Sequence, residues 1–261
     1  MTRPKALILL ATGTNRDHDV AQALELAGAV PKIIPMAALR QSTHPWKNYQ
    51  MLVIAGGFSY SDALGAGKLL ALDLIHYFSE EAAGFIAAGK PVIGICNGFQ
   101  ALVKSGLLPG NPLATQPQAT LTFNHAGHFE CRWVTLKPVS QVCLWTRGLA
   151  ESIACPVAHG EGNFVVNSPT TARKLSDAGQ IALVYVQSDG SPAQGAYPAN
   201  PNGSMLDIAG ICNPAGNVLG LMPHPENHIL HYQHPHWTRG EDRWSGLPLF
   251  INGVKFANEL G

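Results

Sequence analysis

One cysteine stands between two glycines in Gly94-Ile95-Cys96-Asn97-Gly98, after the apolar run PVIGI and before a helical pattern. A strand-to-helix turn this tight strains its central residue and needs glycines on either side, because larger side chains would collide with the turned backbone. The central side chain then projects at the amino end of a helix, where the helix dipole and free N–H groups stabilise a thiolate. Cys96 is therefore predicted to be a nucleophile, although most free cysteines are simply small buried side chains.

A thiolate that attacks an amide also needs a base to move protons and a group to orient that base. Two His-x-Glu pairs offer both: His224 with Glu226 after the run NVLGLM, and His159 with Glu161 after ACPVA. Spacing alone does not choose between them. The first pair is favoured because its apolar run is longer and should lie inside the sheet, near the cysteine.

Attack on an amide also builds a tetrahedral oxyanion, which needs preorganised N–H donors. Gly56 and Gly57 follow the apolar run MLVIA, at the carboxyl end of a strand expected beside that of the cysteine. We expect the backbone N–H groups of Gly57 and Asn97 to be these donors. The alternative is that the two glycines only turn the chain, and both roles are compatible.

Two other signals are weaker. The stretch 65–68, GAGK, lacks the glycine spacing of the nucleotide-binding loops, so ATP or NAD binding by it is not predicted. Four histidines, His228, His231, His234 and His236, lie in a polar stretch broken by proline, without a fixed helical or strand face. We expect a solvated surface loop there and no metal site.

The elements that would position these residues alternate over the first part of the chain. From Lys5 to about Gly106, short apolar runs alternate with helical patterns such as 17–29 and 68–88. This alternation predicts parallel strands covered on both faces, hence a doubly wound α/β sheet.

Beyond Gly106 the pattern changes to apolar runs joined by tight turns such as PNG and NPAGN, after a proline-rich surface connection over 106–118. These runs predict antiparallel strands that extend the parallel sheet. With no internal repeat, the chain is expected to be one domain over 1–261, with a C-terminal extension from about residue 229 that ends in a strand and a helix in FINGVKFANEL.

Composition limits the partners. The 261 residues are 46% hydrophobic and 13% charged, with a formal net charge of zero, so nucleic acid or an anionic membrane would find no basic face. The apolar run Ala6–Ala11 is too short to span a bilayer. Five cysteines without a CxxC pair argue against a disulfide framework and a thiolate zinc site, so a reducing cytoplasm is expected.

Several motifs together resemble a known family: GGFSYSDALGAG, PVIGICNGFQALVKSGLLPG, FECRWV, AHGEGNF and NPNGSMLDIAGICNPAGNVLGLMPHPENH, in this order from about Leu7 to His228. The chain is similar to the glutaminase subunits of phosphoribosylformylglycinamidine synthase, within the class I glutamine amidotransferases. The G-x-C-x-G motif around Cys96, called the elbow below, occurs across that class. The motifs CNGFQ, GGFSY, AHGEG and NPNGS point to the purine enzyme. The chain departs from the family at Ser61, where glycine is usual.

The resemblance implies a flavodoxin-like fold in which Cys96 forms a glutamyl thioester, His224 moves protons and Glu226 orients it. It implies that Gln100 and Asn124 help to hold glutamine, and that His159 and Glu161 lie near the partner or the ammonia exit.

By the same likeness, no cofactor binds this chain. ATP and magnesium belong to a large synthetase subunit, which converts formylglycinamide ribonucleotide, and a small accessory subunit bridges the two. The alternatives are a glutaminase that serves another synthetase and a non-catalytic binding module of the same fold.

Overall fold

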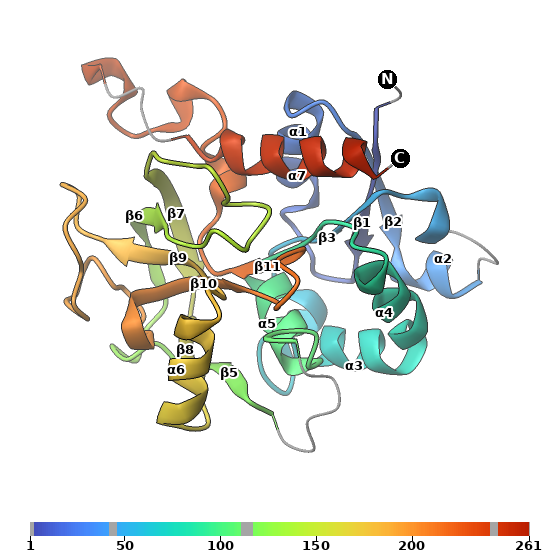
Figure 1. The fold of residues 1–261 in the computed structure, drawn as a ribbon, viewed down its shortest axis with the longest axis horizontal. Helices are drawn as coiled ribbons and strands as arrows, with labels where there is room; N and C mark the ends of the chain where they lie inside the picture. The colour runs from blue at the N-terminus through green and yellow to red at the C-terminus, as the bar shows by residue number, and fades with distance from the viewer. Residues whose placement is uncertain (1–2, 42–45, 111–116, 241–244, 261) are drawn as a thin grey trace.

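The computed structural model describes residues 3–41, 46–110, 117–240 and 245–260 of the chain, so the middle of the expected connection over 106–118 lies outside the described residues. Its strands are β1 (Lys5–Leu10), β2 (Val30–Pro35), β3 (Met51–Ile54), β4 (Val92–Ile95), β5 (Ala119–Thr122), β6 (Glu130–Pro138), β7 (Ile153–His159), β8 (Asn163–Val166), β9 (Ile181–Val186), β10 (Ile208–Cys212) and β11 (Val218–Leu221). Nine of them form one sheet in the order β2-β1-β3-β4-β11-β10-β9-β6-β7, while β5 pairs with β8 (Figure 1).

The strands β2, β1, β3, β4 and β11 are parallel to one another. Every residue of β3, β4 and β11 is buried, as expected for strands covered on both faces. The helices are α1 (Asp17–Leu26), α2 (Met36–Gln41), α3 (Lys68–Tyr77), α4 (Ser79–Ala87), α5 (Asn97–Lys104), α6 (Pro169–Asp177) and α7 (Leu247–Glu259). Helices α1 and α7 lie side by side on one face of the parallel strands, and α3, α4 and α5 cover the other (Figure 1). The predicted doubly wound fold is confirmed.

The expected helix over 68–88 is two helices, α3 and α4, because the chain breaks at Phe78, whose φ is −137°. The expected strand before the last helix is wrong. Residues 247–259 form α7 alone, since its buried residues recur at helical spacing: Leu249, Phe250, Gly253, Val254 and Ala257.

The antiparallel strands β10, β9, β6 and β7 continue the sheet, as predicted. This half of the sheet curves back until its last strand, β7, meets the carboxyl ends of β4 and β11. The backbone N–H of His224, after β11, donates to the Pro156 carbonyl of β7 at 2.8 Å. The Cys96 Sγ, after β4, lies 3.6 Å from the Ala158 carbonyl oxygen. Both halves of the fold therefore contribute to one site.

In the histidine-containing stretch after residue 227, His231 and His236 are exposed, as expected for a surface loop, whereas His228 and His234 are not. His228 is buried, with its Nδ1 2.6 Å from the Ala154 carbonyl oxygen, because Trp133 of β6 offers an aromatic surface to it. The ring of His234 also packs on Trp133. No helix in the described part of the chain has the length and apolar character needed to cross a membrane.

Candidate active site

Cys96 occupies the tight turn between β4 and α5. Its φ is 50° and its ψ is −104°, a backbone conformation that residues other than glycine rarely adopt. Helix α5 begins at the next residue. A Cβ at Gly98 would lie 1.9 Å from the Ile54 carbonyl oxygen, and one at Gly94 would lie 2.7 Å from the Gly98 oxygen. The two glycines are therefore required for the close approach of helix and strands, which is the reason that the sequence motif predicted.

His224 and Glu226 face Cys96 from the turn after β11. The Nδ1 of His224 is 2.7 Å from Glu226 Oε1, and both side chains are buried. The His224 ring and Cys96 both lie beside Gly56, where a Cβ would come within 2.7 Å of His224 Cε1 and 3.5 Å of Cys96 Cβ. Burial disfavours the charged ring, but the charges of Glu226 and Cys96 outweigh it and raise the pKa of His224 to about 10 from 6.5. A protonated imidazole is thus held beside Cys96.

The second His-x-Glu pair has a different arrangement. His159 Nδ1 is 3.1 Å from Asn124 Oδ1, whereas the Glu161 carboxylate faces away, toward Ala66 and Lys104. Burial, followed by the charge of His224, lowers the pKa of His159 to about 3, so its ring is neutral. The structure therefore brings His224 and Glu226 together with Cys96, and it does not pair His159 with Glu161.

Gly57 and Asn97, the two expected oxyanion donors, lie on neighbouring turns. Gly57 has a φ of 142°, and a Cβ there would lie 2.6 Å from the Asn15 nitrogen. Within the described ranges, no backbone carbonyl accepts a hydrogen bond from its N–H. The N–H of Asn97, at the first position of α5, has no acceptor within the helix. Both groups are thus available as donors.

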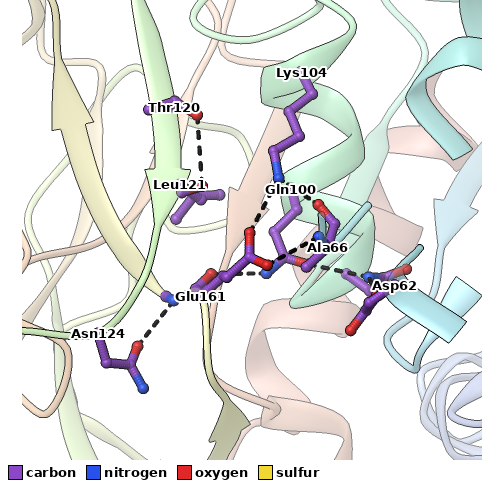
Figure 2. A network of polar contacts seen from close by, with 10 residues as sticks. Asp62, Ala66, Gln100, Lys104, Thr120, Leu121, Asn124 and Glu161 are labelled. Carbon is purple, nitrogen blue, oxygen red and sulfur yellow. Dashed lines mark hydrogen bonds and ion pairs between the residues drawn. The ribbon is translucent and has the colours of Figure 1, made fainter. Parts of the chain in front are cut away.

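The side chains of Gln100 and Asn124 are buried and bonded within the protein (Figure 2). Gln100 Nε2 donates to the Glu161 carbonyl at 2.7 Å. Asn124 Nδ2 donates to the carbonyls of His128 and His159, and its Oδ1 accepts from the Gly162 N–H at 2.9 Å. Because that oxygen must accept, His159 Nδ1 carries the proton. These contacts position the loop after β7. The expected roles of Gln100 and Asn124 in holding glutamine stay predictions.

The sequence analysis did not predict three polar residues beside the elbow: Ser59, Asp62 and Lys104. Asn97 Nδ2 donates to Asp62 Oδ1 at 2.9 Å, and Asn97 Oδ1 accepts from the Ser59 N–H at 3.3 Å and from its hydroxyl. Only their position in GGFSYSD and CNGFQALVK pointed to them. Ser61, in place of the usual glycine, keeps a left-handed φ of 56°.

The part of the chain that the structure describes contains no group of three His, Cys, Asp or Glu side chains that could hold a metal ion.

A strained cysteine elbow that faces a His–Glu pair, in a doubly wound sheet with antiparallel extensions, defines the chain as a glutamine amidotransferase. A family model described as the CobB/CobQ-like glutamine amidotransferase domain matches residues 3–257.

Similar proteins show to which family of glutamine amidotransferases the chain belongs. A Treponema denticola protein described as phosphoribosylformylglycinamidine synthase subunit PurQ is 57% identical over 87% of this chain and 89% of its own length. The protein of that description from Dehalococcoides mccartyi is 40% identical over the full length of both. A solved structure of PurLQS from Thermotoga maritima aligns with a TM-score of 0.73 and 30% identity, over 98% of this chain and 99% of that one. The chain therefore belongs to the PurQ family of phosphoribosylformylglycinamidine synthase subunits.

Proposed function

We propose that this chain hydrolyses glutamine and delivers the ammonia to a synthetase that converts formylglycinamide ribonucleotide to formylglycinamidine ribonucleotide in purine biosynthesis. The relatives described as PurQ support the pathway. The observation that carries the chemistry is the buried arrangement of Cys96, His224 and Glu226 at the elbow.

The Cys96 thiolate attacks the side-chain carbonyl carbon of glutamine, and the carbonyl electrons move onto oxygen. The N–H groups of Gly57 and Asn97 donate to this oxyanion. When the C–N bond breaks, the His224 imidazolium gives its proton to the nitrogen, which leaves as ammonia, and a thioester remains on Cys96. His224 then takes a proton from water, whose oxygen attacks the thioester and releases glutamate. Glu226 holds the Nδ1 proton of His224 and so orients its other nitrogen.

The partners belong to this proposal. A large synthetase subunit would consume the ammonia with ATP and magnesium, and a small accessory subunit would complete the complex; the likeness to PurLQS supports both. This chain would need no cofactor for the steps above. All five cysteines are free thiols, in keeping with a reducing cytoplasm.

The assembled complex tests the proposal, because the synthetase can also be supplied with ammonium salt. We expect Cys96→Ala to abolish glutamine-dependent product formation and to leave ammonium-dependent formation within about twofold of the unsubstituted complex. Glutamine-dependent synthesis that persists in the variant would overturn the role of Cys96.

A further inference from the structure

Glu161 follows β7, outside the group of Cys96, His224 and Glu226, and it connects three segments (Figure 2). Its Oε1 accepts a hydrogen bond from the Ala66 N–H at 3.1 Å, and its Oε2 lies 3.4 Å from Lys104 Nζ on α5. Its backbone carbonyl accepts from Gln100, one turn earlier on the same helix. The loop after β7 is thereby fastened both to α5 and to the loop that follows Gly57.

That second loop, residues 58–67, is strained. Tyr60, Ser61, Asp62 and Leu64 have φ values of 55°, 56°, 53° and 64°, in the left-handed region that costs of order 1–3 kcal/mol per residue. Such a backbone persists only when surrounding contacts determine it. The loop begins directly after one expected oxyanion donor, Gly57.

Besides its backbone hydrogen bonds to Thr12 and Gly13 and the bond of Tyr60 to Asp73, the strained loop has two anchors that involve α5. Near its start, the Asn97 side chain bonds Ser59 and Asp62, so the residue that owns the second oxyanion donor also anchors the loop. Near its end, the Ala66 N–H is held by Glu161, and the Ala66 carbonyl by Lys104. The residues on either side of Gly57 also bond the turn after β1. The two anchors add a connection to α5, and through it they relate the placement of Gly57 to that of Asn97.

We propose that Glu161 is a positioning residue that keeps the N–H groups of Gly57 and Asn97 aligned by fixing the far end of the strained loop against α5. Glu161 contacts no reacting atom. The inference rests on the proposed function, because the oxyanion forms only when a glutamine amide is attacked.

For holding the loop, the hydrogen bond that Glu161 Oε1 accepts from Ala66 matters more than the ion pair of Glu161 with Lys104. The side chains of Lys104 and Glu161 are each 18% exposed, and partly exposed ion pairs contribute little net stabilisation. The hydrogen bond to Ala66 is directional and fixes the backbone itself. Glu161→Gln retains an acceptor for it, whereas Glu161→Ala removes the acceptor.

The test compares these two variants and Glu151→Ala, a control at an exposed residue just before β7, in the complex with the synthetase. Each is assayed for kcat and KM of glutamine hydrolysis and for the rate at which iodoacetamide alkylates Cys96, followed by peptide mass spectrometry. Alkylation by iodoacetamide needs the thiolate but forms no oxyanion, so a misaligned oxyanion site leaves it unchanged.

We expect Glu161→Ala to lower kcat about tenfold or more, with KM within about threefold and alkylation within about twofold. Glu161→Gln should restore most of kcat, and Glu151→Ala should match the unsubstituted chain. A normal kcat in Glu161→Ala, or an equal loss of kcat and alkylation, would overturn the positioning role while the proposed function stands. An unsubstituted complex that does not hydrolyse glutamine would overturn the proposed function, and this inference with it.

Discussion

His224 lies between a buried carboxylate and the Cys96 sulfur, and the negative charges of these two groups raise its pKa. The leaving amine of an amide needs such a proton when its C–N bond breaks. The charge state of one side chain therefore sets the pH range over which the site works.

Glu226→Gln removes the nearest negative charge and should lower the pKa of His224. Since the imidazolium exists below its pKa, glutaminase activity of the unsubstituted complex should be lost as pH rises through about 10. In the variant this basic limb should move to lower pH by about 1 unit or more. The measurement is the pH dependence of kcat for both proteins, and an unmoved basic limb would contradict the assigned role of Glu226.

The neutral His159 ring makes the stability of the fold depend on pH, and this stability should be lost as pH falls. Its pKa is about 3 in the folded chain and 6.5 when unperturbed, so the unfolded chain binds a proton that the folded chain does not. This contribution should destabilise the fold as pH falls from 6.5 through about 3, by at most about 1.4 kcal/mol per pH unit. His159→Asn keeps an N–H for Asn124 and should flatten this slope in urea unfolding. Equal slopes in both proteins would refute the neutral, buried state of His159.

Sequence motifs predicted Cys96 because the glycine spacing encodes its local turn. Spacing alone did not choose between the two histidine pairs, because that choice depends on where β7 meets β11 in space. The longer apolar run before His224 favoured its pairing with Glu226, and the family resemblance implied it. The positioning contacts of Glu161 and Asn97 were also beyond prediction, since each joins segments that are distant in the chain.

At the scale of elements, the close packing of α5 on β3 sets the elbow geometry. Gly98→Ala should destabilise the protein by about 1–3 kcal/mol or more, since its Cβ would overlap the Ile54 carbonyl. Gly84→Ala, on α4 with no atom within 4 Å of the added Cβ, is the matched control and should stabilise by about 0.5–1 kcal/mol. Urea unfolding measures the free energy of unfolding of both variants. An unchanged free energy of unfolding in Gly98→Ala would show that the elbow tolerates a wider turn.

Periodicity predicted most of these elements, because buried parallel strands and amphipathic helices differ in their apolar spacing. It missed α6, whose sequence PTTARKLSD carries only two buried residues, Ala172 and Leu175. It also assigned a strand to the start of α7, because a short apolar run such as LFI fits either state until its neighbours are known.

At the scale of the whole molecule, Ile229 and helix α7 belong to the core. Helix α7 packs on α1 and β3, and the Gly246 N–H donates to the His228 carbonyl at 2.7 Å, close to the turn that carries Glu226. A chain that ends at Gly246 loses the buried side chains Leu249, Phe250 and Val254.

Each such side chain contributes about 1.5–3 kcal/mol, against a total stability of about 5–15 kcal/mol. We therefore expect the truncated chain to be unfolded or insoluble, as judged by circular dichroism and sedimentation. A folded, fully active truncated chain would show that α7 is dispensable.

The most direct test of the account is labelling of the complex with a glutamine-mimicking electrophile, followed by peptide mass spectrometry. We predict a single adduct on Cys96, slowed by glutamine, with the other four cysteines unlabelled on the same timescale. Complete failure of Cys96 to react in the assembled complex, or labelling that glutamine does not slow, would contradict its role as the nucleophile.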